Sequence, residues 1–358
     1  PTGPLLLTMA LACVTSRQHP LSSGDNDDLD LDDILRDLVA DNEGFGGGVL
    51  LATGPDGRRY RGAAGSSTAG GGPISPGATF EIASITKTFT ATTILLLTED
   101  GALALDDPLS VALPSWSSGL LVVGGRDHTP DITIRQLLNH TSGLPDHWAD
   151  PPYLASGNNA FLDAFLDDED RFWTPEEILA YVPDLDPAGR PGEAWHYSDA
   201  NYLLLGLIVE RVTGEALRDV VRDRLLDPLH LDDTWTSFRE DGPLPTSHRY
   251  EGDWDMSDKT HQSADWAGGG LISTIDDLTT FLRALAEDRI FRDSGTLRSM
   301  KSWVPTGSRD IAYGLGLFQV ALDDGTTLWG HDGYGNSFLY LHTGDDTIYA
   351  GTLNQTEN

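Results

Sequence analysis

The segment Ser84-Ile85-Thr86-Lys87 places a hydroxyl group three residues before an amine, at the start of a predicted helix. Residues at positions i and i+3 lie on one face of a helix, so Lys87 can reach the Ser84 hydroxyl. The positive potential of a helix N-terminus also favours an attacking alkoxide and a developing oxyanion. The segment is therefore suited to nucleophilic catalysis.

The S-x-x-K pattern is weak by itself, because a serine N-cap followed by a surface lysine gives the same letters. Lys87 is nevertheless one of only three lysines, against 20 arginines. Burial can lower the pKa of a lysine enough to make it a proton acceptor, which arginine cannot become. The motif alone leaves a catalytic and a capping role equally open. The G-x-S-x-G and H-E-x-x-H patterns of other hydrolases are absent.

Further segments resemble the serine β-lactamase and penicillin-binding-protein-like hydrolases. The resemblance is to the branch with class C β-lactamases, D-Ala-D-Ala carboxypeptidases, D-aminopeptidases and related esterases. Six matching segments follow in family order from residue 80 onward: Phe80–Pro108, Ile132–Pro145 (ITIRQLLNHTSGLP), Pro191–Gly214, Ala267–Leu282, Tyr313–Phe318 (YGLGLF) and Gly330–Gly335 (GHDGYG).

The resemblance implies a role for particular residues of this chain. Ser84 matches the acylated nucleophile, Lys87 its partner, and Tyr197 the tyrosine that exchanges protons with the nucleophile and the leaving group. His331-Asp332-Gly333 matches the K-T-G or H-x-G segment of a strand that lines the substrate pocket, so His331 and Gly333 are expected to bind substrate. The oxyanion hole is expected at the backbone N–H groups of Ser84 and Tyr334.

Two departures from the family pattern concern the substrate. The residue two positions after Tyr197 is usually Asn but here is Asp199, which accepts hydrogen bonds and cannot donate when ionised. Near Lys87, Asp199 would favour the charged ammonium and move the role of base toward Tyr197. A neutral His331 beside Asp332 is also a poor clamp for a carboxylate. Asp199 is expected to contact the substrate, and both departures argue against penicillins and D-Ala-D-Ala peptides as the best substrates.

These observations predict a serine hydrolase that acts through an acyl-enzyme on small esters or on D-amino-acid amides and peptides. D-Ala-D-Ala carboxypeptidase or weak β-lactamase activity is the alternative within the family, and an inactive scaffold protein is the alternative outside it. Partners are expected to be small ester, amide or β-lactam molecules, with no cofactor and no metal. His140, in the NHTSGLP loop, is interpreted as structural.

The hydropathy pattern predicts the elements that must position these residues. Gly46–Thr53 and Arg58–Ala64 are expected to form a β-hairpin, and Ser84–Asp100 a helix. Strands are expected again at Gly314–Leu322, Thr327–Trp329, Ser337–His342 and Thr347–Leu353. The fold class is α+β, of the β-lactamase type: an antiparallel sheet from both chain ends, flanked by helices, with an inserted helical region. The predicted division is an N-terminal segment at residues 1–24, a sheet domain at residues 25–102 with 266–358, and a helical domain at residues 103–265.

The composition adds a strong constraint, because the formal net charge is −33, with 43 Asp and 3 Lys. Such a field repels phosphate backbones, which excludes nucleic-acid binding. The excess of Asp with almost no Lys is typical of proteins that work in concentrated salt. No apolar run is long enough to span a membrane. The oligomeric state is left open.

The N-terminal part carries two weaker signals. Pro4–Val14 resembles the end of a secretion signal, with a loose lipoprotein box at Cys13, and is equally compatible with an ordinary apolar segment. Secretion or attachment to the cell envelope is expected, with the cytoplasm of a salt-accumulating cell as the alternative. The acidic run Ser22–Asp33 lacks the Gly and the terminal Glu of an EF-hand loop, so it predicts a solvated helix start.

The acidic composition generates a prediction about salt. Since salt screens repulsion between like charges, the thermal midpoint of unfolding should climb from dilute buffer to multimolar KCl. Scanning calorimetry at increasing KCl concentrations measures this midpoint. A flat or falling midpoint would contradict salt adaptation.

Overall fold

The computed structural model describes residues 31–41, 46–57, 59–257 and 259–356. The predicted leader, Cys13 and most of the acidic run therefore lie outside the described residues. The first described helix, α2 (Leu31–Asp41), begins within the last residues of the acidic run, where the sequence predicted the start of a helix. Within the described residues, no helix is long and apolar enough to cross a membrane.

The main sheet is antiparallel throughout and has eight strands in the order β10-β11-β12-β13-β14-β15-β1-β2. The late strand β15 pairs with the early strand β1, Leu51 lying opposite Ala350. The two parts of the chain thus share one sheet, as predicted. Its strands are β1 (Gly47–Thr53), β2 (Arg59–Gly65), β10 (Val304–Pro305), β11 (Ile311–Tyr313), β12 (Phe318–Ala321), β13 (Thr327–Gly333), β14 (Ser337–His342) and β15 (Ile348–Thr352).

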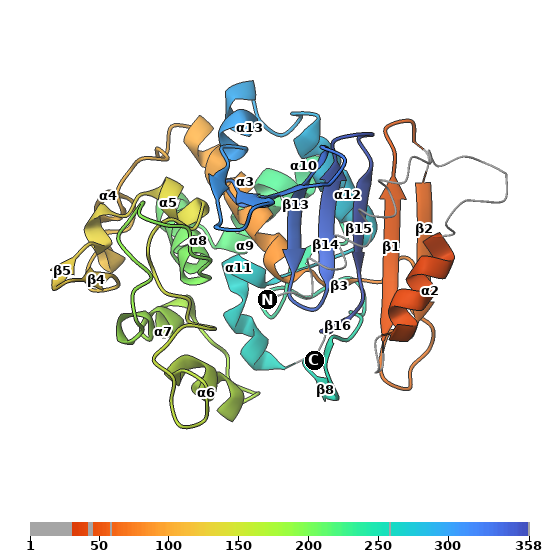
Figure 1. Ribbon diagram of the computed structural model, residues 1–358, viewed down its shortest axis with the longest axis horizontal. Helices are drawn as coiled ribbons and strands as arrows, with labels where there is room; N and C mark the ends of the chain where they lie inside the picture. The colour runs from red at the N-terminus through yellow and green to blue at the C-terminus, as the bar shows by residue number, and fades with distance from the viewer. Residues whose placement is uncertain (1–30, 42–45, 58, 258, 357–358) are drawn as a thin grey trace.

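Helices cover the sheet on both faces (Figure 1). Helix α2 packs on β1 and β2 over a small apolar cluster that includes Leu35, Phe338 and Tyr349. On the opposite face, α12 (Ile275–Ala286) packs against β1, β14 and β15. Because side chains alternate along each strand, the sheet contributes side chains to the packing on each of its two faces.

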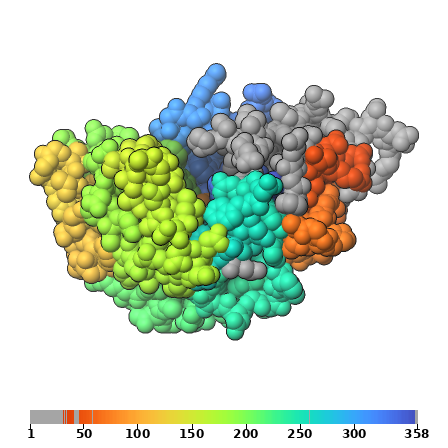
Figure 2. Space-filling model, turned by 90° about the horizontal axis from the view of Figure 1, so that it is seen from below, coloured from red at the N-terminus to blue at the C-terminus, as the bar shows by residue number. Residues whose placement is uncertain are grey.

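Between residues 103 and 265 the regular structure is mainly helical, and the part of this region up to residue 213 lies beside the sheet (Figure 1). Just after α6 (Ala160–Asp167), Glu169 pairs with Lys259 at 2.5 Å and accepts a hydrogen bond from the Trp254 ring nitrogen at 3.0 Å. These two parts of the chain adjoin on the surface in Figure 2. The boundaries at 102/103 and 265/266 stay predictions. Its α-helices are α4 (Leu109–Ala112), α5 (Ile134–Leu138), α6 (Ala160–Asp167), α7 (Pro175–Leu179), α8 (Ala200–Thr213), α9 (Leu217–Val221) and α10 (Asp227–Leu229).

Shorter elements complete the part of the chain that the structure describes. One small sheet has the strand order β3 (Phe80–Glu81), β9 (Leu271–Ser273), β6 (Trp235–Thr236), and another has the order β16 (Gln355–Thr356), β7 (Tyr250–Glu251), β8 (Trp254–Asp255). A further sheet pairs β4 (Val122–Val123) with β5 (Arg126–Asp127). The remaining helices are α3 (Thr86–Glu99), α11 (Trp266–Gly269), α13 (Ser294–Met300), the π-helical η5 (Arg222–Leu226) and the 3-10 turns η1 (Ala83–Ile85), η2 (Pro114–Trp116), η3 (Thr129–Asp131), η4 (Val182–Asp184) and η6 (Thr260–Ala264).

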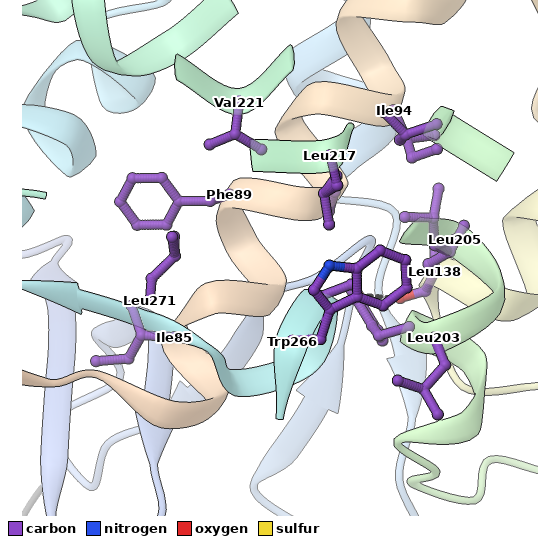
Figure 3. Close-up of a cluster of buried hydrophobic side chains, with 14 of the residues drawn as sticks. Ile85, Phe89, Ile94, Leu138, Leu203, Leu205, Leu217, Val221, Trp266 and Leu271 are labelled. Carbon is purple, nitrogen blue, oxygen red and sulfur yellow. Dashed lines mark hydrogen bonds between the residues drawn. The ribbon is translucent and has the colours of Figure 1, made fainter. Parts of the chain in front are cut away.

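Helix α3 is the central element, and every side chain from Thr86 to Leu95 is buried. Phe89 stacks on Phe281 of α12, with ring centroids 3.8 Å apart, and side chains of α8, α9 and α11 close the core around α3 (Figure 3). The threonines of α3 after its first residue stay satisfied because their hydroxyls donate to backbone carbonyls, as Thr90 does to Ala267 at 2.8 Å. A polar residue in α3 must therefore find its partners inside the protein.

Candidate active site

Lys87 is fully buried in the first turn of α3, with an exposed fraction of 0%. Its Nζ lies 2.9 Å from Ser84 Oγ, 2.5 Å from Asp199 Oδ1 and 2.8 Å from the carbonyl oxygen of Gly268. Three acceptors match the three N–H donors of an ammonium group. The structure therefore surrounds a lysine cation with a hydroxyl, a carboxylate and a backbone carbonyl.

Ser84 lies in the 3-10 turn η1, which links β3 to α3, and its side chain is half-buried. Ala83 adopts a positive φ of 44°, a conformation that is costly for a residue with a Cβ. The Thr86 hydroxyl accepts a hydrogen bond from the backbone N–H of Leu271 at 3.1 Å, which ties the turn to β9. The turn that presents Ser84 is thus strained and held from outside.

The Tyr197 phenol also lies near Ser84, and its interaction with the Ser84 hydroxyl acts to lower the pKa of the phenol. Lys87 Nζ lies 5.0 Å from the centroid of the Tyr197 ring. Burial, and secondly the Asp199 carboxylate, raises the pKa of Tyr197 well above its ordinary value. Asp199 pairs with Lys87 as predicted, but the same carboxylate disfavours a Tyr197 phenolate, so Tyr197 is held as a proton donor.

Strand β13 approaches the nucleophile turn closely. A Cβ on Gly333 would lie 2.4 Å from the carbonyl oxygen of Ile82, so this position requires glycine. The Ser337 hydroxyl donates to the same carbonyl at 3.0 Å. Tyr334 follows β13 directly, with 49% of its side chain exposed. The structure therefore brings the end of β13, where the second oxyanion donor is predicted, against the turn that carries Ser84.

His331 lies on β13 near the site, with its ring centroid 6.5 Å from that of Tyr197, but only 1% of it is exposed. Its Nδ1 donates to the backbone carbonyl of Asp332 at 2.6 Å, and its Nε2 accepts from the Tyr313 hydroxyl at 3.0 Å. Burial and the nearby Lys87 lower its pKa to about 3. His331 is thus neutral with both nitrogens engaged inside the protein, and the structure does not place it as a contact for substrate.

Carboxyl groups cluster around Lys87. Asp199 is 19% exposed, and its backbone N–H donates to Asp146 Oδ1 at 3.0 Å. Burial, and secondly the Asp199 charge, raises the pKa of Asp146 to about 8. Burial also raises the pKa of Asp265 and of Asp332 to about 6 each, and both carboxyls feel the Lys87 charge. Carboxyl groups therefore outnumber the one lysine around Ser84, and Asp146 among them is neutral at neutral pH.

The sequence did not single out Gly268 or Asp146. A Cβ on Gly268 would lie 2.8 Å from Asp199 Oδ1, so glycine is needed where α11 approaches the ion pair. The triple glycine at 268–270 and the acid directly after the loop 139–145 were the available signals. Among the described residues, no group of three His, Cys, Asp or Glu side chains could hold a metal ion.

The chain is similar to known proteins in sequence and in fold. The sequence model of the family described as Beta-lactamase matches residues 31–358. Protein flp of Staphylococcus aureus (strain COL) is 36% identical over 166 residues, which are 46% of this chain and 29% of that protein, so this chain spans well under half of that curated relative.

Two solved structures resemble the chain over nearly its whole length. A D-stereospecific amidohydrolase from Streptomyces sp. has 33% identity and a TM-score of 0.77, covering 90% of this chain and 93% of its own. A D-amino acid amidase from Ochrobactrum anthropi SV3 has 29% identity and a TM-score of 0.76, covering 91% and 93%. The fold predicted from the sequence is confirmed by these structures.

The pKa of Asp146 generates a prediction about stability. Its pKa of about 8 exceeds the ordinary value of 3.8, so the folded protein holds more protons than the unfolded chain between these values. The contribution of the neutral Asp146 carboxyl to the free energy of unfolding is fully present below about pH 4 and is lost as pH rises through about 8. The substitution Asp146→Asn keeps an oxygen that accepts the backbone N–H of Asp199, and it removes the group that ionises. The variant should therefore become more stable than the wild type as pH rises, by about 1 kcal/mol or more in the free energy of unfolding at pH 8.

Denaturant unfolding at several pH values in constant salt measures the difference. The control is Asp184→Asn, at an exposed aspartate, which should follow the wild type at every pH. Parallel curves for the wild type and Asp146→Asn would contradict the assignment.

Proposed function

The chain belongs to the Beta-lactamase family and is a serine hydrolase, and from this premise we propose that it cleaves small esters and D-amino-acid amides through an acyl-enzyme on Ser84. The observation that carries the proposal is the contact of Ser84 with both Lys87 and Tyr197. A serine needs a neighbouring proton acceptor to attack a carbonyl, and the leaving group needs a proton donor. The two neighbours of Ser84 supply these roles.

The acylation step follows from the ion pair. Transfer of one proton from Lys87 to Asp199, across their 2.5 Å contact, leaves a neutral amine. The amine takes the Ser84 proton as Oγ bonds to the substrate carbonyl, and the backbone N–H groups of Ser84 and Tyr334 bind the oxyanion. Tyr197 then protonates the leaving group as its bond to the carbonyl carbon breaks, and Lys87 returns a proton to Tyr197. Asp199 finally returns its proton to Lys87, which restores the ion pair.

The carboxyl groups around Lys87 support a substrate without a carboxylate. The three donors of Lys87 are occupied, and the buried Arg249 is engaged with Glu81 at 3.1 Å. A penicillin or D-Ala-D-Ala carboxylate would approach Asp199 and Asp332, while the described cations Lys87 and Arg249 are already engaged with other groups. An amino-acid amide carries an ammonium group, which the same carboxylates attract. The names of the two amidohydrolases of similar structure support the same class.

Carboxypeptidase or weak β-lactamase activity is the second candidate, favoured by the match to the Beta-lactamase family. An inactive scaffold role is disfavoured because Ser84, Lys87 and Tyr197 lie in contact. We also propose that the enzyme works in concentrated salt, which the net charge of −33 supports.

Steady-state hydrolysis tests the proposal. In multimolar KCl, the wild type should hydrolyse p-nitrophenyl acetate and D-phenylalanine amide. Ser84→Ala should lower both rates by about 10³-fold or more, because it removes the nucleophile. Lys87→Arg should be nearly as damaging, since a guanidinium group does not release its proton. Full esterase activity in Ser84→Ala would contradict the mechanism, and faster cleavage of benzylpenicillin than of either substrate would favour the second candidate.

A second variant tests the part that Asp199 plays in substrate choice. Asp199→Asn removes a negative charge and adds an N–H donor, so acylation by benzylpenicillin should rise relative to hydrolysis of the ester. Loss of the Lys87 ion pair slows both reactions, so the ratio of the two rates reports the change in selectivity separately from this common effect. An unchanged ratio would contradict the role of Asp199 in selectivity and leave the nucleophile assignment intact.

A further inference from the structure

His140 contacts the segment around Tyr197 at three successive residues. Its backbone carbonyl accepts the N–H of His196 at 2.8 Å, and its Nδ1 accepts the N–H of Ser198 at 3.2 Å. Its ring stacks on the Tyr197 ring, with centroids 4.3 Å apart and planes 29° apart. Nδ1 also lies 3.0 Å from Nδ2 of Asn201, in the first turn of α8.

These contacts matter because residues 194–198 have no helix or strand of their own. The backbone around Tyr197 is instead held by the loop 139–146, to which the N–H groups of His196, Ser198 and Asp199 all donate. His140 receives two of these three bonds and supplies the surface under the Tyr197 ring. The position of the phenol therefore depends on this one residue, through its carbonyl oxygen and its ring, more than on local secondary structure.

The His140 ring is built to support Tyr197 and not to titrate. Two N–H donors point at Nδ1, so the proton of the neutral ring lies on Nε2. The ring is fully buried, and burial together with the Lys87 charge lowers its pKa well below 6.5. Nε2 has no hydrogen-bond partner within the described structure. His140 also adopts φ 58°, a strained conformation that surrounding contacts must hold.

We propose that His140 is a positioning residue of the hydrolase: its ring face and its Nδ1 acceptor hold the Tyr197 phenol against Ser84. The proposal rests on the function proposed above, because it assigns to Tyr197 a part in the reaction at Ser84. It gives the NHTSGLP loop a task in the chemistry beyond the structural role expected from the sequence.

Three substitutions separate the two contacts. His140→Phe keeps a ring to stack on Tyr197 and loses the acceptor. His140→Asn keeps an oxygen acceptor, tolerates positive φ and loses the ring. His140→Ala loses both and is expected to slow acylation of Ser84 by about 10²-fold, the effect of a misplacement near 1 Å. His140→Phe and His140→Asn should each be slowed less than His140→Ala.

The decisive readout is the rate at which a fluorophosphonate labels Ser84, measured by intact mass in the wild type and in Tyr197→Phe. If His140 acts through the Tyr197 hydroxyl, His140→Ala should lower the labelling rate by less than about twofold in the Tyr197→Phe background. The hydroxyl that His140 positions is already absent there. His140→Asn should keep the shape of the wild-type pH–rate profile, since His140 does not titrate. The same factor in both backgrounds, or a pH profile that loses a limb in His140→Asn, would overturn the proposal.

Two controls keep the outcome interpretable. His261→Asn removes another fully buried histidine, which contacts Phe165 and the backbone of Glu169, and should lower the thermal midpoint while leaving the labelling rate unchanged. If His140→Ala does not fold, the comparison between the two backgrounds is made with His140→Asn. A wild type without a label at Ser84 would contradict the proposed function. A labelled wild type in which His140→Ala slows labelling by the same factor in both backgrounds would contradict the role of His140 alone.

Discussion

One buried cation organises this molecule. Burying the Lys87 ammonium without partners would cost several kcal/mol, so the fold must bring acceptors to it. The three acceptors come from distant parts of the chain: Ser84 from the turn before α3, Asp199 from the start of α8, and the carbonyl of Gly268 from α11. The requirement to solvate one charge thereby fixes the relative positions of three elements around the nucleophile.

The same carboxylate has two electrostatic effects, which separate the roles of the site's proton carriers. Asp199 stabilises the Lys87 ammonium through direct contact, and its negative charge opposes ionisation of the Tyr197 phenol. Tyr197 is therefore a donor at rest, and Lys87 becomes an acceptor only by passing a proton to Asp199. Behind this pair, Asp146 carries a pKa of about 8, so its neutral form limits the accumulation of charge at neutral pH.

Local patterns in the sequence predicted much of the frame. The hairpin, the helix after Ser84 and the strand Ser337–His342 were within reach because alternation and helical spacing are local signals. The site was less predictable, since Gly268 and Asp146 act only through distant contacts. His331 shows the limit most clearly: the H-D-G segment suggested a contact for substrate, but the hydrogen bond from Tyr313, which the fold alone creates, turns its ring inward.

The central claim is that Ser84 carries the acyl group of the substrate. The most direct test is to mix the enzyme with excess p-nitrophenyl ester, quench it in acid within the first turnovers and measure the intact mass and the peptide map. The account predicts a single added acyl group on the peptide that contains Ser84, with the loss of this adduct in Ser84→Ala. Turnover without any adduct, or an acyl group on another residue, would contradict it.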